Sequence, residues 1–494
     1  MSTTSDHVHN SDCVYCGLDL PFELPESIVK AAKAGRLTIF AGSGISTESS
    51  TVFPTSLYSD FKALLEIDDD DASFPSVMTS YEEAFGRREL IAEIVKRLEY
   101  VESFPAISVL ATKFHDELAT IGHVQTIITT NWDSAFETHC RARPFVVDED
   151  YAYYDLPGRK VFKIHGSVNN VSTIVATQED YVRQEAAFAN SAMGSTLKHL
   201  LATQTVIFVG FSLTDPDFQS IYRSLLQGLG RARPPAYLVG PFENSLAEEF
   251  GLHVIQTDGT NFIRSLKQRL VKDGELFPDS VLMRSRMLAS AARKAQNQVF
   301  EADWKTTPPL LYSIAYLDGV QDCTGRAEKM RTAGDYTYRA HLSHLVHSYD
   351  DLLKVAIAKE RWWDAAYIRG YLNTIISFFV PDNVFDSFDL YEAFDTDEYP
   401  GVLPDDVESP EDDLELGTDE DQEPAPSESD LSPLFDDLDL ELIISIYSES
   451  NCTSKASIEK EAIRLTERLP EGMLFRHTPF LDGVIDSDTP LPHL

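Results

Sequence analysis

The stretch Leu37-Thr-Ile-Phe-Ala-Gly-Ser-Gly-Ile-Ser46 is a short apolar run that leads directly into a glycine-rich turn. Similar apolar runs follow along the chain, at residues 126–130, 161–165, 205–210, 236–240 and 253–256. Between them, residues 88–99 and 107–121 carry apolar side chains at helical spacing. Buried strands that alternate with helices predict an α/β fold, with a doubly wound, mostly parallel, Rossmann-like sheet covered on both faces.

Length and charge limit the classes of protein that the chain can represent. It has 494 residues, which is too many for one ordinary core, so two or three domains are expected. The 41 Lys and Arg against 80 Asp and Glu give a formal net charge of −39. A general nucleic-acid binder needs a basic surface, and an anionic membrane would repel this chain. We therefore expect neither direct nucleic-acid binding nor membrane binding.

The lack of recognisable targeting signals and the small number of cysteines predict a cytoplasmic protein. The sequence has no run of about 18 apolar residues that could span a membrane. Its first residues are polar and lack the basic and apolar regions of a signal peptide. Five cysteines in a chain of this length do not make a disulfide framework, and an odd number fits a reducing compartment.

One strongly acidic segment divides the second half of the chain. Residues 391–440 hold 20 Asp and Glu, no Lys or Arg, and six prolines. Self-repulsion and proline predict disorder there, as a solvated linker or, alternatively, as a regulatory or nucleic-acid-mimicking segment. The predicted organisation is a polar tail at 1–24, an α/β domain at 25–275, a helical domain at 276–390, an acidic disordered linker at 391–432 and a C-terminal helical segment at 433–494.

Polar or glycine residues follow four of the predicted strands, where an open α/β sheet binds its ligands. The first strand ends in the turn Gly42-Ser-Gly-Ile-Ser46, and glycine lets a backbone approach a phosphate closely. The other three ends are Ile127-Ile-Thr-Thr-Asn-Trp-Asp133, Val161-Phe-Lys-Ile-His-Gly166 and Val206-Ile-Phe-Val-Gly-Phe-Ser-Leu-Thr-Asp215.

These four strand ends together resemble the Sir2 (sirtuin) superfamily. Gly42-Ser-Gly-Ile-Ser46 is similar to its Gly-Ala-Gly-x-Ser motif, with Ser43 in place of alanine, and Thr129-Thr-Asn-Trp-Asp133 is similar to Thr-Gln-Asn-x-Asp. His165-Gly166 matches the catalytic His-Gly, and Gly210-Phe-Ser212 matches a later Gly-x-Ser that faces the nucleotide in the family. The resemblance covers about residues 25–272, so it implies a Sir2-like NAD-binding domain at 25–275 and says nothing of the rest.

Departures from the family pattern indicate the subclass. Classical sirtuin deacylases carry a four-cysteine zinc module between the His-Gly and Gly-x-Ser strands, and here no cysteine lies between His165 and Gly210. The family's Asp-Phe-Arg is also missing, and Phe53-Pro-Thr-Ser56 occupies that region. These features resemble the Sir2-like effectors of prokaryotic antiviral defence, which hydrolyse NAD. The resemblance implies an abortive-infection effector, a homo-oligomer, and a partner defence protein or phage-derived trigger.

The chemistry of NAD cleavage suggests a role for each candidate residue. Cleaving the nicotinamide bond of NAD develops positive charge on the ribose, so the site needs a polar group to orient ribose and water, and a base. Asn131 can do the first and His165 the second. Asp133 could bind the carboxamide or stabilise charge. The predicted NAD-binding residues are Gly42, Ser43, Gly44, Ser46, Asp133, Gly210 and Ser212. Valine at Gly44 is expected to abolish binding with little loss of fold.

The alternative is that His165 and Asn131 have structural roles only. His165 would then cap its strand, and Asn131 would cap a helix that begins at Trp132, which is a role that asparagine fills well.

Zinc in the N-terminal tail is a second open question. His7, His9, Cys13 and Cys16 lie close together, and Cys-x-x-Cys suits a tetrahedral zinc corner. The remaining ligands would be two histidines separated by a single residue, so a metal-free tail is favoured and no metal residue is assigned.

Three functions are compatible with the sequence. The favoured one is an NAD+ glycohydrolase (an NAD+ nucleosidase) that releases nicotinamide and ADP-ribose. An NAD-dependent protein deacylase is an alternative that the missing zinc module makes doubtful. A non-catalytic nucleotide-sensing module is the other, and the presence of both Asn131 and His165 weighs against it.

Overall fold

A computed structural model describes residues 20–379, except 50–51, 70–71, 189, 216–217, 220–221, 224–232, 243, 302–309 and 331–334. The chain forms two compact units. Unit 1 runs to Asp279 and includes Ala327–Leu342, and unit 2 holds Ser280–Arg326 and the chain from Ser343 onward. The predicted acidic linker at 391–432, the segment at 433–494 and the tail cysteines Cys13 and Cys16 lie outside the described residues.

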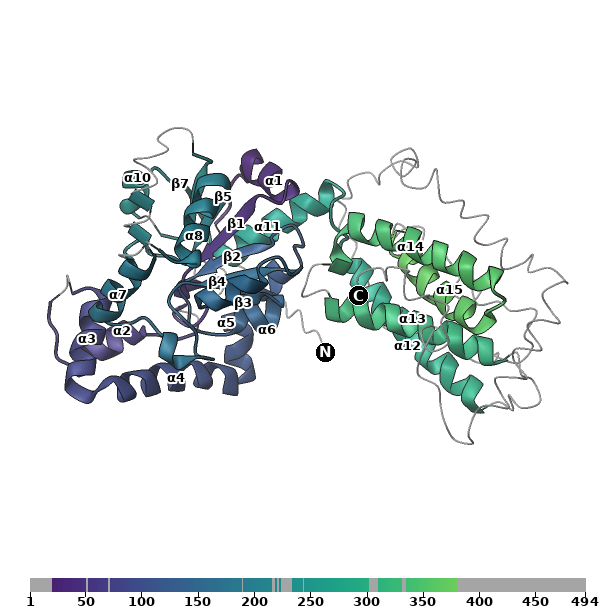
Figure 1. The fold of residues 1–494 in the computed structure, drawn as a ribbon, viewed down its shortest axis with the longest axis horizontal. Helices are drawn as coiled ribbons and strands as arrows, with labels where there is room; N and C mark the ends of the chain where they lie inside the picture. Colours follow the sequence, from purple (N-terminus) through teal and green to yellow (C-terminus); the bar gives the residue numbers. More distant parts are fainter. Residues whose placement is uncertain are drawn as a thin grey trace. The chain divides into compact units, whose positions relative to one another are not determined.

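Unit 1 is built on a seven-stranded sheet in the order β3-β4-β2-β1-β5-β6-β7, and all six pairings are parallel. The predicted doubly wound α/β fold is therefore confirmed (Figure 1). The strands are β1 (Leu37–Ala41), β2 (Thr126–Thr129), β3 (Arg143–Phe145), β4 (Lys160–Lys163), β5 (Thr205–Val209), β6 (Ala236–Gly240) and β7 (His253–Gln256).

Two details of the sheet differ from the prediction. The sequence pattern did not predict β3, because it has three residues, one of them the proline that only an edge strand tolerates. Strand β4 ends at Lys163, so His165 lies in the turn two residues beyond the strand.

Alternating side chains of each strand fill two separate cores, which explains why the strands are apolar throughout. In β1, Leu37, Ile39 and Ala41 join one core, whereas Phe40 joins the other. The first core is closed by α1 (Glu26–Lys33), α5 (Pro105–Ala119), α6 (Ala135–Cys140) and α11 (Gly259–Lys272). The second is closed by α7 (Gln178–Phe188), α8 (Ala192–Thr203) and α10 (Leu246–Glu249).

A small helical cluster interrupts the alternation between β1 and α5. It comprises α2 (Leu57–Leu64), α3 (Phe74–Phe85) and α4 (Arg87–Ser103), which lie together in Figure 1. These helices form their own core, in which Phe61 and Tyr81 stack with ring centroids 3.9 Å apart. Trp132 from the loop after β2 packs against this core, so the cluster adjoins one of the candidate motifs.

Arg159, directly before β4, holds the amino-terminal edge of the sheet together. Its side chain is buried and donates to the carbonyl oxygens of Val124 at 2.8 Å, Ile121 at 2.9 Å and Cys140 at 3.1 Å. Ile121 and Val124 follow α5, and Cys140 is the last residue of α6, where helix carbonyl groups lack partners within the helix. The guanidinium thus joins two helices to the loops that lead into β2 and β4.

We predict that Arg159→Met lowers the free energy of unfolding by about 3 kcal/mol or more, because a buried hydrogen bond to a charged group contributes about 1.5–3 kcal/mol and several are lost. Thermal unfolding measures the effect. Arg264→Met is the matched control, since Arg264 is a partly exposed arginine whose ion pair with Glu117 spans 3.5 Å, and ion pairs near the surface contribute about 0–1 kcal/mol. Equal melting temperatures for the two variants would contradict the role of Arg159.

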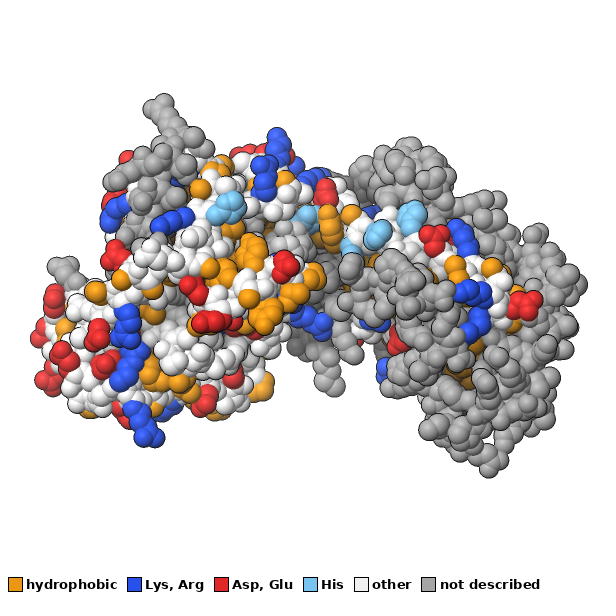
Figure 2. All heavy atoms as spheres, in the orientation of Figure 1, with side chains coloured by type: hydrophobic (Ala, Val, Ile, Leu, Met, Phe, Trp, Pro, Cys, Tyr) orange, Lys and Arg blue, Asp and Glu red, His pale blue; other side chains and the backbone are white. Residues whose placement is uncertain are grey.

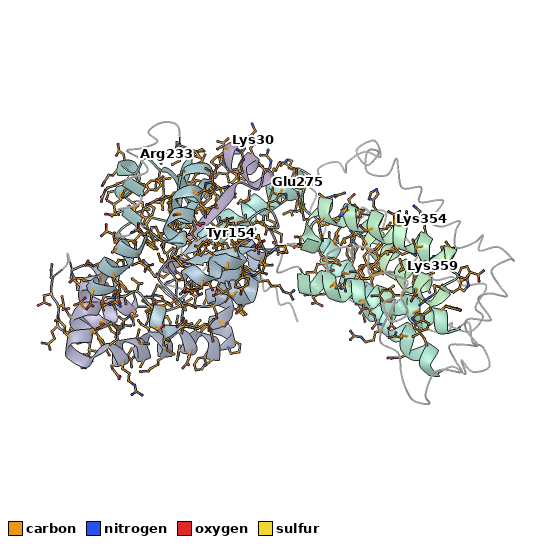
Figure 3. All side chains as sticks on the ribbon, in the orientation of Figure 1. Lys30, Tyr154, Arg233, Glu275, Lys354 and Lys359 are labelled. Carbon is orange, nitrogen blue, oxygen red and sulfur yellow. The ribbon has the colours of Figure 1, made fainter. Side chains whose placement is uncertain are left out.

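A group of apolar side chains is exposed around β3. Val147, Tyr153, Tyr154 and Leu156 are each more than a third exposed, and the Lys160 ammonium lies 5.3 Å from the centroid of the Tyr154 ring. Figure 2 shows apolar side chains gathered on this face of unit 1, where Figure 3 labels Tyr154. Such groups are a common feature of contact surfaces.

Unit 2 is helical in its described part, as predicted for this region. Its helices are α12 (Asp279–Glu301), α13 (Leu310–Met330), α14 (Arg339–Ala358) and α15 (Trp362–Ser377). Helices α13 and α15 approach backbone to backbone, because a β-carbon on Gly319 would lie 2.1 Å from the Tyr367 carbonyl and one on Gly370 would lie 2.0 Å from the Tyr316 carbonyl. None of the described helices in either unit combines the length and hydropathy needed to cross a membrane.

Candidate active site

The candidate residues gather at the carboxyl ends of adjacent strands in unit 1. Strand β1 lies between β2 and β5, and β4 lies beside β2. The chain passes from β1 to one side of the sheet and later crosses to β5 on the other side, which is the topological switch point where such sheets bind ligands. All of the candidate residues follow these four strands.

Glycines allow the turns after β1 and β5 to touch. The Gly44 N–H donates to the Gly210 carbonyl at 3.1 Å, and the Gly42 N–H donates to the Val209 carbonyl at 2.9 Å. A β-carbon on Gly42 would lie 2.3 Å from the Gly210 oxygen, and one on Gly44 would lie 3.0 Å from it. Gly210 itself has a φ of +58°, which favours glycine. The glycines are therefore needed for contact between two loops, whatever ligand the site holds.

This contact changes the interpretation of the first motif. The sequence suggested that a side chain at Gly44 would meet the phosphates of NAD, but its nearest neighbours here are backbone atoms of Gly210. Within the turn, the Ile45 N–H donates to the Gly42 carbonyl and the Ser46 N–H to the Ser43 carbonyl. Several backbone groups that were expected to face phosphate are thus already bonded, while the side chain of Ser43 is exposed. Phosphate binding by residues 42–46 stays a prediction.

A buried polar network joins the first motif to the second. The Asn131 side-chain N–H donates to the Ser46 hydroxyl at 3.2 Å, and that hydroxyl donates to the Asp133 carboxylate at 3.2 Å. All three side chains are buried. The Asn131 backbone N–H is held by the Thr129 hydroxyl at 3.0 Å, which in turn donates to the Ala41 carbonyl. Asn131 is thus fixed at both its backbone and its side chain.

One hydrogen-bond acceptor of this network, the side-chain oxygen of Asn131, is not used by the described residues. The Asn131 Oδ1 is buried and has no hydrogen-bond partner among the residues that the structure describes. A buried amide oxygen without a partner is costly, so a ligand hydroxyl that donated to it would be favoured.

The interpretation of Asn131 as a helix cap is wrong. Helix α6 begins at Ala135 rather than near Trp132, and the Ala135 N–H donates to the Asp133 carboxylate at 3.0 Å. The capping role in this loop therefore falls to Asp133, and Asn131 is left to bind Ser46.

His165 belongs to a second buried group, beyond the end of β4. Its side chain is 5% exposed, and its Nε2 lies 3.4 Å from the Asp215 carboxylate. The Tyr181 hydroxyl donates to the same carboxylate oxygen at 3.1 Å, and the Tyr181 ring stands edge-on to the imidazole with centroids 5.0 Å apart. This arrangement fixes the imidazole from two sides and gives it the carboxylate partner typical of a general base.

The backbone conformation and close packing after His165 require a glycine at position 166. Gly166 has a φ of +83°, and a β-carbon there would lie 2.1 Å from the Thr173 carbonyl. The His165 carbonyl accepts from the Val175 N–H at 3.1 Å, so residues 173–175 hold the turn that carries the histidine.

Ser212 differs from the other candidates. It is exposed, its hydroxyl bonds to that of Thr214 at 2.7 Å, and its carbonyl accepts from the Asn244 side chain at 2.9 Å. It lies at the same edge of the sheet but outside the buried networks of Asn131 and His165.

Sequence reasoning missed three residues that contact these networks. Asp215 ends the Gly-x-Ser stretch quoted from the sequence but received no role there, whereas no sequence signal marks Tyr181. Lys163 is two residues before the histidine, and its ammonium contacts the loop of Asn131. No group of three or more His, Cys, Asp and Glu side chains within the described ranges is arranged to hold a metal ion.

Comparison with known proteins matches this fold to a known family. Residues 125–260 match the model of the SIR2-like domain family. The chain is 26% identical over 223 residues to the NAD(+) hydrolase ThsA of Enterococcus faecium. The aligned region covers 42% of this chain and 44% of that protein. It is 30% identical over 116 residues to the NAD(+) hydrolase ThsA of Bacillus cereus, covering 22% and 24%. The Defense-associated sirtuin 2 of Bacillus subtilis is 22% identical over 209 residues, covering 39% and 19%.

Fold, motifs and family match together identify a Sir2-like domain in unit 1. Its relatives are named as NAD-hydrolysing and defence-associated proteins, so the resemblance to Sir2-like defence effectors is confirmed. The chain matches less than half of the length of these relatives.

Proposed function

We propose that this protein is an NAD+ glycohydrolase that cleaves NAD to nicotinamide and ADP-ribose. The observation that carries the proposal is the pair of buried groups after β2 and β4: Asn131 held by Ser46 and Thr129, and His165 beside Asp215. The names of the relatives support the substrate.

The two groups supply what cleavage of a cationic leaving group needs. The Asn131 Oδ1 would accept a hydrogen bond from a ribose hydroxyl or from the attacking water, and His165 would take the proton of that water. Asp133, and Asp215 beyond the imidazole, would stabilise the positive charge that develops on the ribose and on the imidazole. Gly42, Ser43, Gly44, Ser46, Gly210 and Ser212 are proposed to contact the nucleotide.

Incubation with NAD tests the proposal, with nicotinamide and ADP-ribose separated by chromatography over time. Release of both products without an acylated peptide is the expected result, and it would separate a glycohydrolase from a deacylase. The same products should be followed in cells that express the protein, because an effector that needs a trigger can be silent when purified. NAD binding by calorimetry without products in either setting would favour a nucleotide-sensing module instead.

The names of the relatives also suggest a biological setting. We propose an antiviral effector that acts in the cytoplasm by abortive infection, depleting NAD once a partner defence protein or phage-derived trigger activates it. A homo-oligomer is part of the same proposal.

A further inference from the structure

Lys163 is a buried lysine at the end of β4, two residues before the proposed base. Its side chain is 1% exposed, although lysine is among the residue types least often buried. A buried ammonium is costly unless several acceptors surround it, so its partners indicate what it does.

The partners of Lys163 come from the loop that carries Asn131. The ammonium donates to the carbonyl oxygen of Trp132 at 3.4 Å, to that of Asp133, and to the Glu137 carboxylate at 2.9 Å. Trp132 and Asp133 follow Asn131 directly, and Glu137 lies in α6, immediately beyond them. One side chain therefore spans from the strand that leads to His165 to the loop that leads away from Asn131.

Both partners of the Lys163–Glu137 ion pair are largely shielded from solvent. Its carboxylate is mostly shielded, and burial raises its pKa while the Lys163 ammonium opposes that rise. Its second oxygen is buried and has no hydrogen-bond partner among the described residues. The pair thus depends on Lys163, since without the ammonium the carboxylate would remain buried with little to stabilise it.

We propose that Lys163 is a positioning residue, which fixes the Asn131–Asp133 loop against the His165 turn so that both reach one bound ribose. The proposal rests on the proposed function. Backbone carbonyls of two successive residues bound to one ammonium leave the loop little freedom. A displacement of about 1 Å in an active site can cost about 100-fold in rate, so loss of this contact should be visible in turnover.

Two variants separate positioning from stability. Lys163→Met removes the charge and the donors but keeps the length of the side chain, and it leaves Glu137 unpaired. Lys163→Met combined with Glu137→Met removes both charges, so the melting temperature should return most of the way to that of the wild type. The two carbonyls still lack their donor in the double variant, so kcat should stay about 100-fold low, with KM changed less than about threefold.

Lys267→Met is the matched control. Lys267 is a nearly buried lysine in α11 whose ammonium lies 2.7 Å from Asp279, and it contacts no candidate residue. This variant should lose stability and keep wild-type kcat.

Amide hydrogen exchange tests the placement without any turnover. In the single and double variants, peptides that cover residues 130–136 should exchange at least about tenfold faster than in the wild type, while peptides from β5 and β6 should not change. Unchanged exchange at 130–136, or recovery of kcat together with melting temperature in the double variant, would overturn the role of Lys163. A wild type that releases no nicotinamide either when purified or in cells would instead count against the proposed function, and exchange would still decide the positioning.

Discussion

His165→Ala and Asn131→Ala are each expected to lower NAD hydrolysis by at least about 100-fold, which is the scale of a lost general base or of a lost electrostatic contact at the reacting centre. The His165 imidazole lies beside Asp215 and Tyr181 in a turn beyond the end of β4, so it is not part of a strand or helix. The Asn131 side chain bonds to Ser46 and does not cap α6. We therefore expect melting temperatures within a few degrees of the wild type.

His123→Ala is the matched control for this experiment. His123 is also a buried histidine beside a carboxylate and a tyrosine, with its Nε2 3.6 Å from Glu275 and its ring 4.5 Å from that of Tyr338. It precedes β2, so it lies at the opposite edge of the sheet from the candidate site. Loss of this ring should lower the melting temperature and leave turnover per folded molecule intact. Activity above half of the wild type in folded His165→Ala would remove His165 from the mechanism.

Gly42→Ala and Gly44→Val are both expected to abolish NAD binding and, in contrast to the expectation from sequence, to destabilise unit 1. The added β-carbon would press on the Gly210 backbone, which cannot rotate away as a side chain can. Overpacking of this kind costs about 1–3 kcal/mol. Calorimetric titration with NAD and thermal unfolding measure the two effects.

Gly240→Ala provides the comparison. Gly240 ends β6 at the same edge of the sheet, and nothing lies within 4 Å of a β-carbon built there. This variant should bind NAD and unfold like the wild type. Binding without loss of stability in Gly42→Ala would mean that the two turns are not in contact as described.

Sequence patterns predicted the sheet well because strands buried on both faces have a simple signature. The central strands β1 and β5 are apolar at nearly every position and are followed directly by glycine, and both were predicted to within one residue. Strand β3 was missed because a three-residue edge strand with a proline has no such signature. For the region after unit 1's sheet, the fading of the strand pattern predicted a mainly helical structure, and the described part of unit 2 is helical.

The candidate site was predicted less completely, because motifs show which residues are present but not which atoms meet. Asn131 and His165 stand out as strand-end polar groups, and the structure adds their partners. Tyr181 lies in a helix and reaches Asp215 through tertiary packing, which leaves no trace in local sequence. The glycines stand out in the sequence, but the feature that requires them in the structure is a neighbouring loop far away in the chain.

The arginine before β4 has a consequence for the behaviour of the protein in acid. The acceptors of Arg159 named above are backbone carbonyls, which do not titrate, and arginine keeps its proton at every ordinary pH. The proposed site depends instead on carboxylates, and Glu137 gains its proton at a higher pH than an exposed glutamate because burial raises its pKa. As the pH falls, the Lys163–Glu137 ion pair should therefore lose its negative partner, while the hydrogen bonds of Arg159 at the amino-terminal edge of the sheet persist.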